Sequence, residues 1–383
     1  MVVPPSRSGG FHFHDTSLFG STCGFHAYLR HGSYGTTLSL VSKGAPVKAY
    51  EIVPRETKDP FDVLVPTERP SPEPGPGEVK VRVRAASLNF RDLSIARGAK
   101  GRASPVVPLS DGAGEVVAVG SGVSRVAVGD RVAASFFPTW LDGDLSDAHH
   151  AQALGGGRDG MLAEEVVLPE ASWIRLPEHL SFEEGATLPC AGLTAWHALF
   201  EAVTLRPGDV VLVQGTGGVS VFALQLAKSA GARVIVTSSS AEKREKARAL
   251  GADHVLDYVA DPAWGDAARA LTGGRGVDVV VDVGGPGTFD QSVKALRYGG
   301  TMSLLGVLTG TKGEVNTYGI FQKTLRVAGI YVGSVSMFER FVRALAANRT
   351  RPVVDRVFPF DEARAAYTYL ASGSHFGKVV VAI

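Results

Sequence analysis

The hydrophobic positions between about residues 178 and 323 alternate between short apolar runs and longer segments with helical spacing. The run at 210–213 is uninterrupted and only one strand long, which is typical of a buried parallel strand. Similar apolar runs follow at 233–237, 254–258, 277–283 and 301–305. Between the first two runs, Phe222, Ala223, Leu226 and Ala227 have helical spacing. The alternation predicts an α/β domain with a doubly wound parallel sheet.

The residues on either side of this segment follow a different pattern. Between residues 47 and 177, Pro and Gly turns separate short strands, and residues 78–84 alternate as a half-buried strand does. Further strands are predicted at 326–332 and 378–383, with a helix near 338–347. We therefore expect a β-rich domain made of residues 47–177 and 324–383, interrupted by a parallel-sheet domain at 178–323. Ligands would enter a cleft at the carboxyl ends of the parallel strands.

Two segments have no clear period. Residues 1–46 are rich in Gly, Ser and His, and we expect either a disordered extension or a start placed too far upstream. His12 and His14 in this segment indicate metal binding only weakly, because two histidines without a scaffold are a poor site. Residues 138–160 are polar and Gly-rich, so we expect a surface loop.

Composition and charge narrow the class of protein. A chain of 383 residues can build two domains with a sizeable core. A formal net charge of +1 gives no electrostatic reason to expect nucleic acid or an anionic membrane as partner, and no apolar stretch approaches the length of a bilayer span. Only two cysteines are present, Cys23 and Cys190, which excludes a disulfide framework and a four-thiolate zinc loop. We expect a cytoplasmic enzyme that acts on a small molecule.

A glycine-rich turn follows the first predicted parallel strand. It comprises Gly215, Thr216, Gly217, Gly218 and Val219, and a helix and a second strand come after it. Gly215 permits a tight turn, and Gly217 lets backbone N–H groups approach a pyrophosphate at the start of the helix. Ser220 takes the third glycine position of the usual fingerprint and is small enough to keep the helix close to the strand. The alternative is a plain strand–helix–strand unit; we predict a dinucleotide site.

The residues after the second strand favour NADP over NAD. NAD-binding units usually place an acidic residue there for the ribose 2′-hydroxyl. Here the chain has Ser238, Ser239 and Ser240, followed by Lys243 and Arg244. Small hydroxyls and cations suit a 2′-phosphate better. The alternative is that residues 242–248 are simply a solvated helix face with an i,i+4 pair between Glu242 and Lys246.

Several separated motifs, in order, resemble one family. They read LNFRDL at 88–93, PLSDGAGEV at 108–116, VGDRV at 128–132, LPCAGLTAW at 188–196 and HFGKVV at 375–380. Together they resemble the medium-chain dehydrogenase/reductase superfamily, most closely its zinc-independent quinone oxidoreductase and alcohol-dehydrogenase-like branch. The resemblance covers residues 47–383. It implies a Rossmann domain inserted in a GroES-like catalytic domain, in a chain that assembles as a dimer or a tetramer; we expect a homodimer.

The same resemblance bears on zinc. Zinc-dependent members bind the catalytic metal through three of these motifs, and the matching positions here are Asn89, Ser110 and Cys190. Asn and Ser are poor zinc ligands, and one thiolate cannot hold the ion alone. We expect a zinc-free site in which Cys190 is a small buried thiol lining the cleft.

The resemblance also implies roles for particular residues. It places Asn89 beside the nicotinamide, where it could donate to a substrate oxygen; the alternative is a loop-stabilising Asn. For Arg91 and Asp92 we favour a local ion pair. Residues 94–100 contain no tyrosine of the kind that enoyl reductases use as proton donor. The expected activity is NADPH-dependent reduction of a quinone or an α,β-unsaturated carbonyl, with metal-free alcohol oxidation or cofactor binding with little turnover as alternatives.

Cofactor contacts are implied in the same way. Thr194 would pack on the nicotinamide, while Lys243 and Tyr258 would close around the 2′-phosphate with Ser239. The remaining implied contacts lie in loops near the ribose, carboxamide and pyrophosphate: Gly284, Gly306, Val307, Phe376 and Lys378. The alternatives are packing for Phe376, a back-bonded helix hydroxyl for Thr194 and a strand-end residue for Tyr258.

Overall fold

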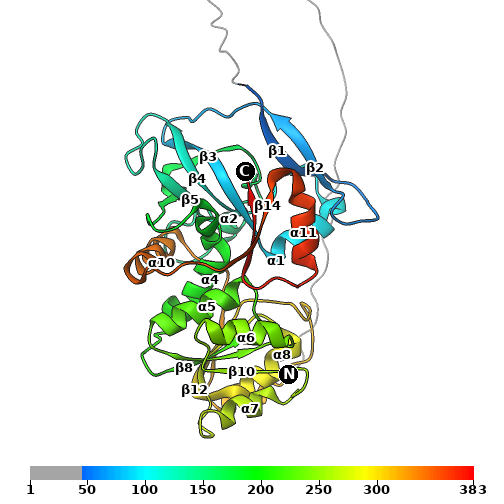
Figure 1. Cartoon of the computed structure of the whole chain (residues 1–383), viewed down its shortest axis with the longest axis vertical. Coiled ribbons are helices and arrows are strands. Elements are labelled where there is room, and N and C mark those ends of the chain that lie inside the picture. Colours follow the sequence, from blue (N-terminus) through cyan, green and yellow to red (C-terminus); the bar gives the residue numbers. More distant parts are fainter. Residues whose placement is uncertain (1–44) are drawn as a thin grey trace, which may run out of the picture. The chain divides into compact units, whose positions relative to one another are not determined.

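The computed structural model describes residues 45–383, and the predicted extension at 1–46 lies almost wholly outside this range. Lys43–Ile383 forms one compact unit. Two sheets and a separate two-stranded ribbon account for its strands (Figure 1). In the described part of the chain, none of the helices has both the length and the apolar character needed to cross a membrane.

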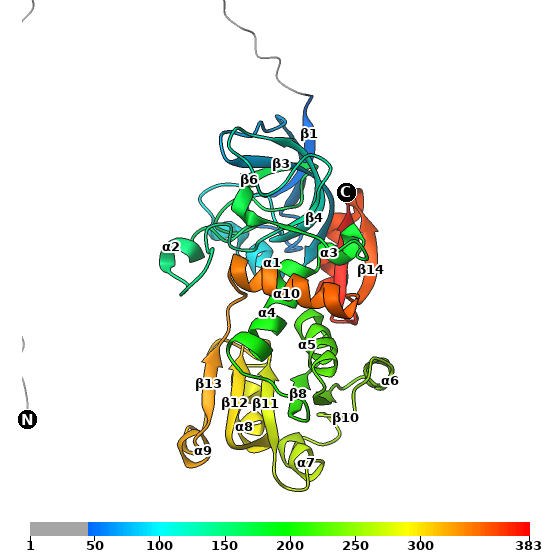
Figure 2. The ribbon, with the colours of Figure 1, turned by 90° about the vertical axis from the view of Figure 1, so that its left-hand side faces the viewer.

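One sheet has six parallel strands in the order β10-β9-β8-β11-β12-β13. Their bounds are β8 Val210–Gln214, β9 Arg233–Thr237, β10 His254–Leu256, β11 Val277–Asp282, β12 Leu296–Leu304 and β13 Arg326–Gly329. Figure 2 shows β8, β11, β12 and β13 side by side. Strand order reverses between β8 and β11, so the loops after these two strands flank the point where such sheets bind ligands. This confirms the predicted doubly wound α/β fold.

The parallel sheet is buried because its strands are apolar on both faces. Val211 and Val213 of β8 point into one hydrophobic cluster, whereas Val210 and Leu212 point into another. Alternate residues of a strand face opposite sides, so both clusters draw on each strand. The helices that accompany this sheet are α5 Gly218–Ser229, α6 Ala241–Ala249, α7 Trp264–Ala270, α8 Pro286–Ala295 and α9 Tyr318–Gln322.

The second sheet belongs to the β-rich part of the chain and is mostly antiparallel. Its strand order is β14-β15-β3-β4-β5-β7, with β6 paired to β3. Its strands are β3 Glu78–Leu88, β4 Asp111–Val119, β5 Arg131–Ala134, β6 Glu165–Pro169, β7 Trp173–Arg175, β14 Val354–Pro359 and β15 Lys378–Ala382. The separate ribbon is β1 Val47–Ile52 with β2 Leu64–Arg69. Strand β15 returns from the far end of the chain to pair with β3, which places Val379 opposite Leu88.

The remaining helices are α1 Phe90–Arg97, α2 Asp147–His150, α3 Phe182–Gly185, α4 Leu193–Trp196, α10 Val335–Asn348 and α11 Ala363–Ala371. Short 3₁₀ turns lie at Ala99–Gly101, Glu170–Ser172 and Phe360–Glu362. Wide π-type turns at Leu188–Gly192 and His197–Glu201 flank α4. Such turns inside a helix are uncommon and occur often at functional sites.

Two expectations about the course of the chain differ from the structure. Strand β13 pairs with β12, so the parallel sheet extends beyond the predicted boundary at residue 323. The segment 138–160 is not only a surface loop, because it contains α2 and the buried side chains of Trp140 and Leu154. Its glycines allow close packing: a Cβ on Gly155 would stand 2.6 Å from the carbonyl carbon of Leu109. No hydrophobic period signals this packing, since backbone contacts produce it.

Candidate active site

The glycine turn begins directly after β8 and has the conformation that a dinucleotide site requires. Gly215 has φ +70°, a region that other residues rarely adopt, and its N–H donates to the carbonyl of Thr237 at the end of β9 (2.8 Å). Gly217 is the N-cap of α5, and the atom nearest to an added Cβ there is Nε2 of His375, 4.0 Å away. The first N–H groups of a helix point outward and attract anions. The turn therefore fits a pyrophosphate.

Ser220 explains how α5 stays close to the sheet without a third glycine. Its hydroxyl donates to the carbonyl of Gln214 (2.7 Å), and the residue is buried. Thr216 is also buried, and its carbonyl accepts from the N–H of Gly377 (3.0 Å). The turn is thus bonded to β9 on one side and to the C-terminal loop on the other.

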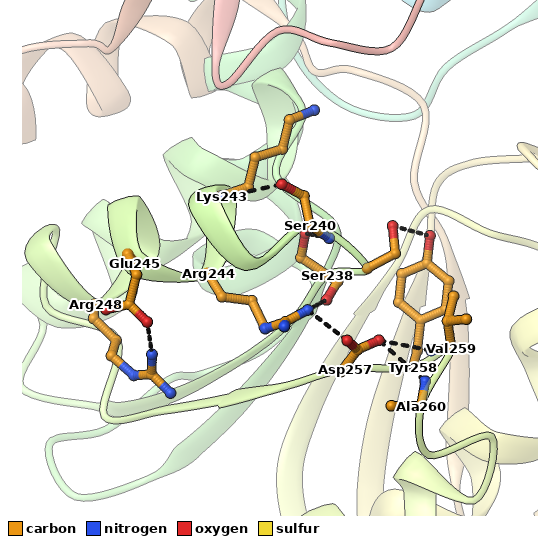
Figure 3. A network of polar contacts seen from close by, with 11 residues as sticks. Ser238, Ser240, Lys243, Arg244, Glu245, Arg248, Asp257, Tyr258, Val259 and Ala260 are labelled. Atoms are coloured by element: carbon orange, nitrogen blue, oxygen red, sulfur yellow. Dashed lines mark hydrogen bonds and ion pairs between the residues drawn. The ribbon is translucent and has the colours of Figure 1, made fainter.

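Serines at the end of β9 meet Tyr258 in a polar corner (Figure 3). The hydroxyl of Tyr258 donates to Oγ of Ser239 (3.3 Å), and Oγ of Ser240 caps α6 by accepting from the N–H of Lys243 (3.3 Å). No carboxylate stands among Ser238, Ser239 and Ser240. This corner brings together Ser239, Tyr258 and the first turn of α6.

The two cations of this corner have different partners. Nζ of Lys243 donates to the carbonyl of Gly373 in the C-terminal segment (2.6 Å), and burial lowers the pKa of its ammonium. Arg244 instead bonds to Oδ2 of Asp257 (2.8 Å) and to the carbonyl of Ser238 (2.7 Å), so Asp257 neutralises it. The solvated pair between Glu242 and Lys246 is also present.

The glycine loops after β11 and β12 are braced against each other. The N–H of Gly284 donates to Oδ1 of Asp282 (3.0 Å) and to Oε1 of Gln214 (3.2 Å), while its carbonyl accepts from the N–H of Thr309 (2.9 Å). Gly306 leaves no room for a side chain, since an added Cβ would lie 2.2 Å from the carbonyl oxygen of Val283. Val307 beside it is 48% exposed, which leaves its side chain open to a ligand.

Thr194 lies on α4 between the two π-type turns and is buried. Phe376 is also buried, and its ring packs in the large hydrophobic cluster that covers one face of the parallel sheet. The structure therefore supports the packing alternative for Phe376.

Asn89 begins α1 and belongs to a buried polar cluster. Its N–H donates to Oδ2 of Asp92 (2.7 Å), and burial raises the pKa of that carboxyl to about 6. The expected local pair is present, with Nη1 of Arg91 3.7 Å from Oδ1 of Asp92. Arg91 also donates to the carbonyl of Leu154 (3.0 Å) and lies over the ring of Phe136.

Lys378 follows the C-terminal loop that meets the glycine turn, and its ammonium lies in the polar cluster around Asn89. Its Nζ lies 2.6 Å from Oδ1 of Asn89 and 2.6 Å from the carbonyl oxygen of Leu88, with Oδ2 of Asp111 at 4.0 Å. Strand pairing is the cause: Val379 faces Leu88 across β15 and β3, and Ser87 faces Asp111 across β3 and β4. Three neighbouring strands thus bring Lys378, Asn89 and Asp111 to one place.

Asp111 connects this cluster to Ser110 and Cys190, the two other positions that the resemblance matches to zinc ligands. Its Oδ1 accepts from the hydroxyl of Ser110 (2.7 Å), and its Oδ2 accepts from the N–H of Cys190 (3.1 Å). Burial raises the pKa of the Cys190 thiol, and the nearby Asp111 raises it further, so the sulfur is held as a neutral thiol. Within residues 45–383, no three His, Cys, Asp or Glu side chains gather as a metal site.

Sequence reasoning missed some participants. No role was predicted for Asp111, although the sequence offered a signal, an acidic residue directly after Ser110. His375 lies near Gly217, and burial lowers the pKa of its imidazole to about 4, with Lys243 and Lys378 contributing. Gln214, which bonds to Asp282 and Ser292 behind the glycine turn, gave no signal in the sequence.

Two family models match most of the described chain. An alcohol dehydrogenase GroES-like domain matches residues 75–178, and a model described as zinc-binding dehydrogenase matches residues 218–347. A zinc-type alcohol dehydrogenase-like protein of Schizosaccharomyces pombe is 46% identical over 307 residues, which cover 78% of this chain and 89% of that protein.

Solved structures give the same picture. An NAD-dependent alcohol dehydrogenase aligns with a TM-score of 0.79 and 37% identity, over 88% of this chain and 99% of its own. A mycobacterial protein, Rv1454c, whose structure contains NADPH, aligns with a TM-score of 0.73 and 30% identity, over 88% of this chain and 100% of its own.

Proposed function

Since the chain belongs to the medium-chain dehydrogenase/reductase superfamily of alcohol-dehydrogenase-like oxidoreductases, we propose that it is a zinc-independent enzyme that uses NADPH to reduce a quinone or an α,β-unsaturated carbonyl. One observation carries the proposal. The ammonium of Lys378, bonded to Asn89, lies among the positions at which zinc-dependent relatives place their metal ligands.

The donor set supports a reaction without zinc. Asn89 uses its carbonyl oxygen for Lys378, Ser110 uses its hydroxyl for Asp111, and only Cys190 of these three residues is of a type that binds zinc well. Zinc requires deprotonated sulfur, imidazole or carboxylate ligands, usually three from the protein in a catalytic site. A cation in the same cluster would also repel a metal ion. The residues present therefore do not fit zinc, and no step is assigned to it.

The choice of NADPH rests on the polar corner after β9. Ser239 and Tyr258 provide hydroxyls, and the cation of Lys243 lies on the first turn of α6, where the helix dipole also favours negative charge. An acidic residue at this strand end, which would select NAD, is absent from residues 238–240. Relatives of known structure include one described as NAD-dependent and one solved with NADPH, so the preference is argued from these residues.

A conjugated acceptor suits the chemistry of the site. The bound reduced nicotinamide would supply a hydride to the substrate carbon. Without a Lewis acid, the negative charge that develops on the substrate oxygen must be met by hydrogen-bond donors. Quinones and enones spread that charge over a π-system, which lowers the demand on the donors. Residues 94–100 offer no tyrosine as proton donor, which favours these acceptors over enoyl thioesters.

The test measures oxidation of NADPH and of NADH with 1,4-benzoquinone, cyclohex-2-enone, cyclohexanone and an aldehyde, with the zinc content determined on the same preparation. We expect turnover with the quinone or the enone, a preference for NADPH, and less than stoichiometric zinc. Stoichiometric zinc, or activity confined to simple alcohols and ketones, would contradict the proposal. The second outcome would favour the alternative function, metal-free alcohol oxidation.

We also propose that the chain forms a homodimer through the β13 edge of the parallel sheet. β13 ends the strand order, and Val327 on it is 39% exposed. Tyr318 and Phe321 on the neighbouring α9 are 57% and 69% exposed. An unpaired strand edge beside exposed aromatic side chains favours pairing with another chain, and a second copy presents the same surface.

A further inference from the structure

The ammonium of Lys378 is buried, with the residue only 3% exposed. A buried charge is costly unless hydrogen bonds and opposite charge compensate it. Two of its three N–H groups are used, one by the carbonyl of Leu88 and one by Oδ1 of Asn89. Oδ2 of Asp111, at 4.0 Å, is near enough to balance the charge but too far for a hydrogen bond. One N–H of the ammonium is therefore left without an acceptor among the described residues.

The amide of Asn89 carries a second unused donor next to the first. An ammonium has no lone pair, so the amide oxygen of Asn89 must face Lys378 and its nitrogen must face away. That nitrogen, Nδ2, has no hydrogen-bond partner in the described part of the chain, although Asn89 is only 9% exposed. The carboxyl of Asp111 is the group that this amide influences: burial raises the pKa of Asp111 and a weak interaction with Asn89 acts to lower it, although no acceptor lies within hydrogen-bond distance of Nδ2. Buried donors of this kind are rare, because each costs free energy when it is unsatisfied.

We propose that Nζ of Lys378 and Nδ2 of Asn89 together bind the oxygen of the substrate, so that a protein ammonium takes the place of the metal. The inference deepens the function proposed above and rests on it. Bound NADPH would supply a hydride: its C–H bond would break as a C–H bond forms at the β-carbon of an enone, and the π electron pair would move onto the carbonyl oxygen. The two donors would stabilise that charge until a proton from water reaches the α-carbon and gives the saturated ketone; the anion of a reduced quinone would take its proton on oxygen and give the hydroquinone.

The position of the Lys378 stem supports this role over a contact with the pyrophosphate. The stem passes the first residue of α5, where a Cβ added to Gly218 would lie 2.6 Å from Cδ of Lys378. The side chain thus starts beside the glycine turn, but its Nζ donates hydrogen bonds to Leu88 and Asn89. The carboxyl of Asp111 is held beside Nζ of Lys378 by the hydroxyl of Ser110 and by the N–H of Cys190.

The test compares wild type with Lys378→Met, which keeps an unbranched stem and removes the donor, and with Asn89→Ala. Lys294→Met serves as the matched control, since Lys294 is half-exposed and pairs with Asp266 at 3.8 Å on the surface. Two quantities are measured: kcat with cyclohex-2-enone or 1,4-benzoquinone, and the Kd values of NADPH and of isobutyramide from NADPH fluorescence. Isobutyramide presents a carbonyl oxygen to the donors but does not accept a hydride.

We expect Lys378→Met to lower kcat about 100-fold and to raise the Kd of isobutyramide about tenfold, while the Kd of NADPH changes by less than about threefold. A large rise in the Kd of NADPH with isobutyramide binding unchanged would assign Lys378 to the pyrophosphate and overturn the proposal. If Lys378→Met does not fold, Asn89→Ala tests the proposal. Its kcat should fall and its Kd of isobutyramide should rise, each by a smaller factor than in Lys378→Met.

Failure of the proposed function gives a different result. In that case wild type turns over none of the acceptors, but the isobutyramide measurement still decides the inference. Binding to the wild-type NADPH complex that is lost in Lys378→Met supports the donor pair. No binding to wild type, or equal binding to both proteins, contradicts it.

Discussion

The N–H of Gly377 donates to the carbonyl of Thr216, 3.0 Å away, and so bonds the C-terminal loop to the glycine turn after β8. The same loop continues directly into Lys378, whose ammonium reaches Asn89. One short segment therefore contacts both the cofactor-binding turn and the polar cluster.

Gly377→Ala should destabilise the protein by about 3 kcal/mol, as measured by denaturant unfolding. Gly377 has φ +85°, and an added Cβ would lie 2.5 Å from the carbonyl oxygen of Val353. Gly122→Ala is the matched control, with φ +83° and nothing within 4 Å, and should cost only the backbone strain of about 1 kcal/mol. Equal losses in the two variants would show that the close contact at Gly377 has no effect.

Lys243→Ala should raise the KM for NADPH about tenfold and leave the KM for NADH nearly unchanged. The reason is that the ammonium is expected to bind the 2′-phosphate, which NADH lacks. Lys246→Ala on the same helix is the control, because Lys246 is half-exposed and paired with Glu242. Equal effects of Lys243→Ala on the two cofactors would contradict the assignment of the polar corner.

The stability of the protein should depend on the protonation of Asp92. Burial raises the pKa of this carboxyl from 3.8 to about 6 in the folded protein, so folding favours its protonated form. Asp92 therefore destabilises the fold at neutral pH, and that destabilisation is relieved as the pH falls from about 6 to about 4. Asp92→Asn should remove this dependence. The gain in unfolding free energy of the variant over wild type should therefore be larger at pH 7 than at pH 4, by roughly 2 kcal/mol.

The measurement is the difference in unfolding free energy between wild type and Asp92→Asn at several pH values, because other groups titrate equally in both proteins. Asn can still accept the N–H of Asn89, so the cap of α1 is kept. A difference that is constant between pH 4 and pH 7 would show that Asp92 titrates normally.

Val327→Lys combined with Phe321→Lys should convert a dimer into a monomer of 40.2 kDa, as measured by light scattering after size-exclusion chromatography. The charges would have to be buried against a second copy at the β13 edge, which is costly without partners. Val128→Lys is the control, since Val128 is 63% exposed and lies outside the parallel sheet. A monomeric wild type, or a variant that stays dimeric, would contradict the proposed interface.

Local patterns in the sequence were enough for the parallel sheet and the glycine turn. β8 and β9 match their predicted runs to within one residue, and Gly215 has the positive φ that its place in a tight turn predicts. Residues close together in the chain determine these features, so periodicity and turn chemistry reveal them.

The position of Lys378 could not be predicted in the same way. Its ammonium bonds to Asn89, which is 289 positions away, and only the register of β15 on β3 brings the two together. The family resemblance placed Lys378 at the pyrophosphate because its motif follows the loop that meets the glycine turn. The backbone before Lys378 does meet the glycine turn. The direction of the Lys378 side chain, however, depends on the space left beside Gly218.

That space links two positions that are far apart in the sequence. A methyl group on Gly218 would collide with the Lys378 stem, and Ala191 closes the other side at 3.1 Å. A larger residue at 218 is therefore compatible only with a shorter side chain at 378, which could not carry a charge to Asn89. Among homologues, the two positions should vary together, and chains that have lost this glycine should also have lost the lysine.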